Sequence, residues 1–270
     1  MNFNMIELGV NSVLFGGFDF ATACKYIKLA GYDGLEISAI KGMCEHLVLD
    51  NWREQVDEVR RIVDENGLKI LSMEVASLDE DRLTKAFEAS SVLGIPVVNV
   101  GPGGKSDIPE DLENSIAKLK KMSEKAEEYG VTLCVKAHVG SAIYNTPTTL
   151  YAMSKIDSKA FGIDMDPSHI YRSGENPEEA ILKVLPRVRH IHIRDCKGRT
   201  SGPGTPFMQI CGRGDINLVA FCKNLVDGGY SGPVCLEIIG ALQLSLPEVV
   251  LIASESYGYL NAIFKQLGVR

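Results

Sequence analysis

Ionisable side chains stand at the ends of short apolar runs in this sequence of 270 residues. Four of its five histidines lie there: His138, His169, His190 and His192. Buried strands should be apolar, because an ionisable group removed from water is costly unless it is paired or binds a ligand. A hydrogen-bonded position in a pocket wall would explain any one of these histidines. The whole set indicates a functional site.

Asp166, His192 and Glu237 end three successive apolar runs, so we expect them to converge. Two carboxylates and one imidazole are ligands that Mn2+, Mg2+, Co2+ or Zn2+ accepts. A bound ion would polarise a substrate carbonyl and make the neighbouring C–H proton easier to remove. The alternative is that the two carboxylates form salt bridges with Lys136 and Arg194 without a metal. The residue types favour the metal site as the first hypothesis.

The segments between the apolar runs have helical periodicity. In residues 51–66, Trp52, Val56 and Val59 recur at spacings of three and four, and Gly67 follows where a helix should end. The apolar runs are short and rich in Val, Ile and Leu, as buried parallel strands are. The eight runs span residues 6–15, 34–38, 69–75, 97–103, 132–138, 161–166, 188–195 and 233–239, and further helical patterns span residues 79–93, 110–129 and 217–228.

Eight strands alternating with helices fit either a closed barrel or a doubly wound open sheet. An open sheet would normally begin with a Gly-rich phosphate loop, and Gly16-Gly17 after the first run is not that fingerprint. No linker or low-complexity tract divides the chain. We therefore predict an α/β fold with one (β/α)8 TIM barrel domain over residues 1–270.

In such a barrel the catalytic side chains sit at the carboxyl ends of the strands. Every predicted strand of this chain offers a polar residue there, and we take these residues as the candidates for the site. They are Asn11, Glu36, Glu74, Asn99, Lys136, His138, Asp164, Asp166, His169, His190, His192, Arg194, Asp195 and Glu237.

Composition excludes several classes of protein. The net charge of −7 argues against a nucleic-acid partner, which basic proteins bind by neutralising phosphates. The seven cysteines are odd in number and irregularly spaced, which is typical of reduced thiols in the cytoplasm. We find no signal peptide and no apolar stretch approaching the ~18 residues of a membrane span. The expected protein is cytoplasmic and has no nucleic-acid or membrane partner.

The ordered phrases GYDGLEIS, LGIPVVNVGPGG, DMDPSHIYRSGENPEEAI, RHIHIRDCKGR and GRGDIN resemble the xylose isomerase-like barrels. GGYSGPVCLEI continues the series, so the resemblance runs from residue 6 to about residue 240. These barrels are the sugar phosphate isomerase/epimerase proteins related to endonuclease IV. The resemblance implies a TIM barrel enzyme, but it does not specify a substrate.

The resemblance also implies a metal site with four ligands. Its Asp matches Asp166 in a D-x-x-H phrase, its His matches His192 in HIRD, and its last Glu matches Glu237 in CLEI. The family's first Glu, which is usually both a ligand and an acid/base, falls on Lys136 in VKAH. A protonated lysine cannot bind a divalent ion, so this position departs from the family pattern.

Three hypotheses follow from Lys136. A metal remains on the other three ligands, and Lys136 stabilises an oxyanion or acts as a base. Alternatively, the ammonium group occupies the place of the metal and its charge does the same work. In the third hypothesis, Lys136 forms a Schiff base with a carbonyl substrate.

Other candidates surround this centre. The resemblance implies that His138 and His169 contact substrate and that Glu36 orients its neighbours. Glu74 is a candidate to bind a hydroxyl or accept a proton, and Asn99 is a further substrate contact. The loop 196–216 resembles a lid or substrate wall. Cations that could meet a phosphate or carboxylate of the substrate are Arg194, Lys197, Arg199 and Arg213.

We predict an isomerase or epimerase of a small sugar, keto-sugar, inositol derivative or hydroxy-acid. A proton next to a carbonyl would be removed and returned by Glu237, with Lys136 or Glu74 as the second group, while the metal stabilises the enediolate. The rivals are a dehydratase or lyase, a Schiff-base aldolase, an abasic-site endonuclease and a binding module without turnover. The family resemblance suggests a homodimer or homotetramer.

Overall fold

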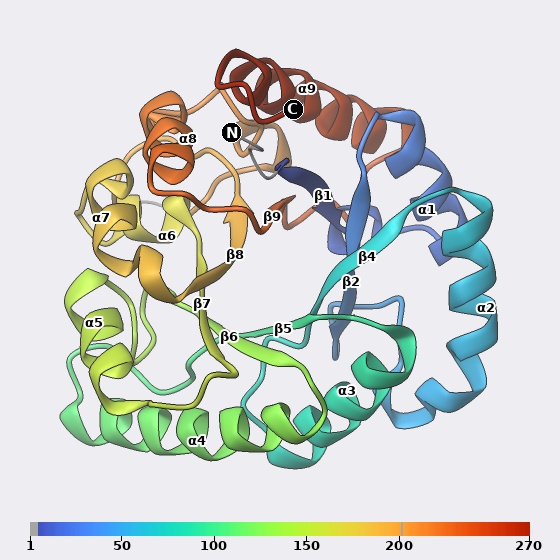
Figure 1. Ribbon diagram of the computed structural model, residues 1–270. Helices are drawn as coiled ribbons and strands as arrows, with labels where there is room; N and C mark the ends of the chain where they lie inside the picture. Colours follow the sequence, from blue (N-terminus) through green and yellow to red (C-terminus); the bar gives the residue numbers. More distant parts are fainter. Residues whose placement is uncertain (1–4, 201) are drawn as a thin grey trace.

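The computed structural model describes residues 5–200 and 202–270, which form a closed (β/α)8 barrel (Figure 1). Neighbouring barrel strands are parallel, and β1 pairs with both β2 and β9, which closes the ring. The predicted TIM barrel is confirmed. The barrel strands are β1 (Glu7–Asn11), β2 (Gly34–Ile40), β4 (Lys69–Glu74), β5 (Val97–Val100), β6 (Thr132–Lys136), β7 (Phe161–Met165), β8 (Val188–Ile193) and β9 (Pro233–Leu236).

Helices surround this ring of strands in Figure 1. Among the described residues they are α1 (Phe20–Leu29), α2 (Trp52–Glu65), α3 (Glu80–Leu93), α4 (Pro109–Glu128), α5 (Thr146–Lys155), α6 (Pro167–Arg172), α7 (Pro177–Val184), α8 (Leu218–Asp227) and α9 (Leu246–Gln266). No helix in this part of the chain combines the length and apolar character needed to cross a membrane.

Local sequence explains how α3 is delimited. The side chain of Asp79 accepts a hydrogen bond from the backbone N–H of Arg82 (2.8 Å), which caps the start of the helix. Glu80 and Asp81 place negative charge near the positive end of the helix dipole. Gly94 ends the helix with φ of 74°, a left-handed conformation that glycine adopts without strain.

Short elements depart from the predicted alternation. The first apolar run continues beyond β1 as a 3-10 helix, η1 (Ser12–Phe15). A two-residue strand, β3 (Cys44–Glu45), pairs antiparallel with the end of β2. The short helix α6 lies between β7 and α7, so two helices follow that strand. The remaining short 3-10 helices are η2 (Leu49–Asn51), η3 (Leu185–Arg187) and η4 (Pro206–Met208).

The seam that closes the barrel is built from glycine. Gly9 of β1 lies opposite Gly34 of β2 in the register of the pair. A Cβ atom on Gly34 would lie 2.4 Å from the backbone oxygen of Lys69, and one on Gly9 would lie 2.8 Å from Cys235 Sγ. These contacts are closer than packed atoms allow, so the absence of side chains lets β2 approach β4 and lets β1 approach β9.

Candidate active site at the carboxyl ends of the strands

The ammonium group of Lys136, at the end of β6, lies at the centre of the site. Its Nζ donates to Glu237 Oε1 at 2.6 Å and to Glu74 Oε1 at 3.2 Å. It also lies 3.1 Å from Nδ1 of His192. All four side chains are buried, and they come from β4, β6, β8 and the residue after β9. The barrel thus brings together residues that are far apart in the sequence.

Arg194, the residue after β8, supplies a second cation beside Lys136. Its Nη2 donates to Asp166 Oδ2 at 3.2 Å and to His169 Nε2 at 2.9 Å, and its Nε donates to Ser168 Oγ at 2.8 Å. Asp166 also caps α6, since its Oδ1 accepts from the backbone N–H of Ser168 at 2.8 Å. Asp166 is therefore held by the start of a helix and by the guanidinium group.

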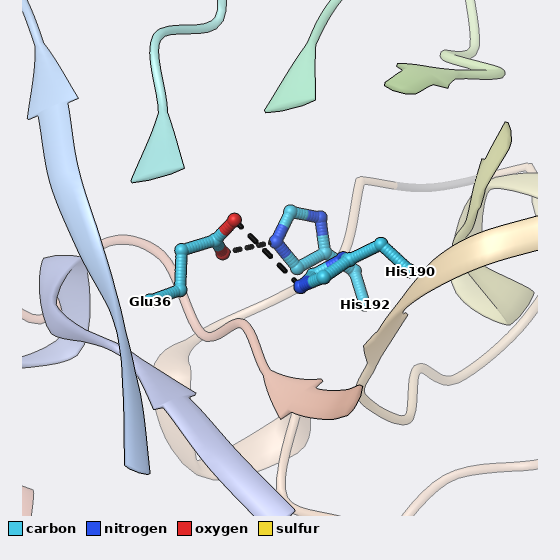
Figure 2. Close-up of side chains that lie close together, drawn as sticks. All are labelled: Glu36, His190 and His192. Carbon is cyan, nitrogen blue, oxygen red and sulfur yellow. Dashed lines mark hydrogen bonds and ion pairs between the residues drawn. The ribbon is translucent and has the colours of Figure 1, made fainter. Parts of the chain in front are cut away.

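A polar network supports this centre from inside the barrel. Figure 2 shows Glu36 facing both His190 and His192, and Glu36 Oε2 forms a short contact with His192 Nε2. On the other side of the imidazole, Asp164 Oδ2 lies 2.6 Å from His192 Nδ1. Glu36 also accepts from Asn11 Nδ2 at 2.7 Å and from Asn99 Nδ2 at 2.5 Å. Carboxylates thus face both ring nitrogens of His192 and fix the orientation of the ring.

The surroundings shift the pKa values of Glu237 and Glu74 in opposite directions. Burial alone would raise the pKa of Glu237, but Lys136, His192 and Arg194 outweigh it and hold that pKa well below its ordinary value. Burial raises the pKa of Glu74 to about 8, although the charge of Lys136 acts against this. Near neutral pH one carboxyl group is ionised and the other is largely protonated, which is the division between a base and an acid.

Opposite charges keep Lys136 protonated. Burial would lower the pKa of this ammonium group, but the charge of Glu237 and of the carboxylates around it more than offsets burial, so the pKa lies above its ordinary value. A neighbouring imidazole behaves differently, because burial and the charge of Arg194 lower the pKa of His169 well below its usual range. The site therefore presents a protonated Lys136 and, beside Arg194, a neutral His169.

A cavity of about 280 Å³ opens above this centre. Its polar wall includes His138 and His169, whose ring centroids lie 4.1 Å apart. Glu237 Oε2 and Arg194 Nη1 are 3.2 Å apart, yet neither atom makes a hydrogen bond within residues 5–200 and 202–270. The residues that line the cavity are Ile40, Met43, Glu74, Ala76, Gly101, Gly103, Lys136, His138, Ser141, His169, Arg194, Glu237 and Ile239.

Six of the ten predicted site residues line the cavity, and Asn99, Asp166, His192 and Arg213 do not. Asn99 lies beneath the cavity, where it donates to Glu36, and is not part of the lining. Arg213 is also outside the lining, because its guanidinium group is paired with Glu255 of α9 (Nε to Oε1, 2.6 Å). Its place in the structure thus differs from the predicted substrate contact. Ser168, which the sequence-based prediction missed, stands inside the D-x-x-H phrase and binds Arg194.

Residues 24–250 match the family model described as the xylose isomerase-like TIM barrel. The match covers most of the chain and includes every strand from β2 to β9. The chain belongs to this family. The resemblance that the sequence phrases carry is thereby confirmed.

Members of the xylose isomerase-like family include enzymes with different reactions. The inosose dehydratase of Clostridium botulinum (strain Alaska E43 / Type E3) is 25% identical over 147 residues, which are 50% of this chain and 49% of that protein. This chain spans about half the length of the curated relatives it matches.

Solved structures share the fold over nearly the whole chain. A D-tagatose 3-epimerase-like protein is 22% identical with a TM-score of 0.76, and 97% of this chain and 100% of that chain are covered. The IOLI protein with a bound zinc atom is 19% identical with a TM-score of 0.78, and 96% of this chain and 99% of that chain are covered. At these identities the likeness shows the fold alone.

The side chains present are of the kind that binds a divalent metal. Two groups of described residues have ligand atoms within 4.8 Å of one another: Glu36, His190 and His192, and Glu74, His192 and Glu237. These groups are compatible with the predicted divalent metal in its general form, without deciding which ion it would be. Asp166, the third predicted ligand, is in neither group and binds Arg194 instead.

The side chains of Glu74, His192 and Glu237 are of the right chemical kind for a metal ion, but the space between them is filled. The Nζ atom of Lys136 contacts Glu74, His192 and Glu237 at 3.2, 3.1 and 2.6 Å. A zinc ion bound by the same carboxylates would lie about 2.0–2.2 Å from their oxygens, in the volume that Nζ fills. The residues therefore do not fit a metal ion in the conformation that the structure has.

Proposed function

We propose that this protein is an isomerase or epimerase that moves a proton at the carbon next to the carbonyl of a small polyhydroxylated compound. The observation that supports this most is the ion pair between Glu237 Oε2 and Arg194 Nη1, two atoms of cavity-lining residues that make no other hydrogen bond among the described residues. One is a proton acceptor and the other a donor for a developing negative charge, and they lie 3.2 Å apart. A C–H group and the adjacent carbonyl oxygen need such a pair.

The proposed reaction has two proton transfers. Glu237 Oε2 takes the proton from carbon, and the electron pair of the C–H bond moves to the carbonyl oxygen to form an enediolate. Arg194 and Lys136 stabilise the negative charge on this oxygen in a site that excludes most water. Glu74, the protonated carboxyl group on the cavity wall, then returns a proton to carbon. Return to the same carbon on the opposite face inverts the centre. Return to the former carbonyl carbon isomerises the compound, provided that the proton of the adjacent hydroxyl group moves to the former carbonyl oxygen.

Dehydration is the second candidate function. It is favoured by the curated relative that is an inosose dehydratase. The first step would be the same, but Glu74 would give its proton to a departing hydroxyl group, so that water is lost. The same cavity and the same pair of carboxyl groups serve both reactions.

The contacts of Lys136 do not favour a Schiff base. An amine attacks a carbonyl only when it is deprotonated. Lys136 donates to two carboxyl groups, and the charge of Glu237 above all raises the pKa of the lysine above its ordinary value. We assign it to charge stabilisation instead.

Solvent proton exchange tests the proposed function. We expect the protein, incubated in D2O with a panel of polyhydroxylated ketones and aldehydes, to introduce deuterium next to the carbonyl of its substrate. Glu237→Gln should slow this exchange by about 10²-fold or more, because the base is lost. Glu65→Gln, on the exposed side of α2 and paired with Arg61, is the matched control and should exchange like the wild type.

Mass spectrometry and NMR of the product separate the two reactions. A deuterated product of otherwise unchanged composition means isomerisation or epimerisation, and a product that has lost water means dehydration. Exchange by Glu237→Gln at the wild-type rate would contradict the role of Glu237 as the base.

A further inference from the structure

The cationic side chains of Lys136 and Arg194 contact each of the three side chains that the sequence predicts as metal ligands. Arg194 Nη2 binds Asp166 Oδ2 at 3.2 Å, and Lys136 Nζ lies 3.1 Å from His192 Nδ1. Glu237 has one oxygen 2.6 Å from Lys136 Nζ and the other 3.2 Å from Arg194 Nη1. The carboxylates that would neutralise a divalent ion are thus already paired with two positive charges.

The contacts of His192 also argue against a bound metal ion. Glu36 forms a short contact with its Nε2, and both Asp164 Oδ2 (2.6 Å) and Lys136 Nζ (3.1 Å) lie against its Nδ1, so neither ring nitrogen is open to an ion. Only an imidazole nitrogen with a free electron pair binds a metal ion. His192 is therefore engaged in the network beneath the cavity.

Burial makes these contacts persistent. Lys136 is 5% exposed and Arg194 is 2% exposed, and both are held by several partners. Withdrawing either cation to admit an ion would leave a buried charge without its counter-ion, which is strongly unfavourable. An ion that entered beside them would face two positive charges at short range.

We propose that Lys136 and Arg194 together replace the divalent metal in this chain, so that the site works without one. The ammonium group lies between Glu74, His192 and Glu237, and the guanidinium group bridges Asp166 and Glu237. Both line the cavity where the substrate oxygens would lie. This inference deepens the proposed function, because it names the source of positive charge, but its test needs no substrate.

Metal content tests the inference directly. Wild type, Lys136→Glu and Lys136→Met are each dialysed against excess Mn2+, Co2+ or Zn2+, passed through a desalting column and measured by elemental analysis and thermal unfolding. We expect wild type to retain less than about one-tenth of an ion per chain with no change in Tm. Lys136→Glu restores a carboxylate at the family's ligand position, so it should retain about one ion per chain and gain Tm with metal.

Lys136→Met is the matched control, because it removes the charge without adding a ligand, and it should stay empty. Circular dichroism of each variant before loading shows whether it is folded. About one ion per wild-type chain, with a Tm that falls on chelation, would overturn the inference. An empty, folded Lys136→Glu protein would overturn it as well, since the ammonium group would then not stand in a metal position. Neither outcome depends on the deuterium exchange that tests the proposed function.

Discussion

At the scale of single residues, Glu36 orders the buried network. Its carboxylate accepts from Asn11, Asn99 and Ser72 and contacts His192 (Ser72 Oγ to Oε1, 3.1 Å). The sequence predicts Glu36 as a residue that orients its neighbours, and these contacts are what such a role requires. Several donors share the two carboxylate oxygens of Glu36, so removing its negative charge would leave donors unpaired.

Glu36→Gln should therefore lower the free energy of unfolding by about 3 kcal/mol or more, since breaking one side of a buried ionic network typically costs about 3–5 kcal/mol. Urea unfolding followed by circular dichroism measures this change. The exposed Glu65→Gln change should stay within about 0.5 kcal/mol of wild type. Equal unfolding midpoints for the two variants would mean that Glu36 does not hold the network together.

The residue types and their place at strand ends predicted Glu74, Lys136, His192 and Glu237 as members of one site. Salt bridges of Asp166 and Glu237 with Lys136 and Arg194 were only the alternative to a metal site, because a salt bridge depends on side-chain directions that sequence spacing does not give. Arg194 and Arg213 illustrate this limit. Both were predicted as anion contacts, yet one lines the cavity and the other pairs with Glu255.

At the scale of elements, the repeated order of helix, glycine and apolar strand predicted the barrel well. The predicted helix 79–93 corresponds to α3 (Glu80–Leu93), and 110–129 corresponds to α4 (Pro109–Glu128). The strand β3 and the helix α6 were not predicted, since two to six residues are too few to show a period. Tertiary contacts at the ends of β2 and β7 define these short elements.

Two glycine substitutions test the packing of elements. Gly34→Ala should destabilise the protein by about 1–3 kcal/mol. A Cβ atom there would lie 2.4 Å from the backbone oxygen of Lys69 and would force β2 and β4 apart. Gly258→Ala is the matched change within α9, where nothing lies within 4 Å of the added atom. It should stabilise the protein by about 0.5–1 kcal/mol, because alanine favours the helix.

Thermal and urea unfolding of both variants show whether each substitution stabilises or destabilises the protein. Gly34→Ala as stable as wild type would show that β2 and β4 do not need their close approach. A loss of stability in Gly258→Ala would contradict the open surroundings of that helix position.

At the scale of the whole molecule, the closed ring explains why residues from position 36 to position 237 act as one unit. Parallel strands that all point the same way place their carboxyl ends around one cavity. This convergence could be predicted from the strand count and the absence of a phosphate loop. A metal-free site with Lys136 and Arg194 was predicted only as an alternative to the metal site, because the two cations are far apart in the chain and only the closed barrel brings both to Glu237.

The most direct test of this account is the rate at which the protein introduces solvent deuterium next to the carbonyl of its substrate, measured with and without an excess of chelator. We expect the same rate in both conditions, because Glu237 moves the proton and the charge of Lys136 and Arg194 stabilises the enediolate. A rate that falls with chelator to that of Glu237→Gln and returns on adding a divalent ion would contradict the account.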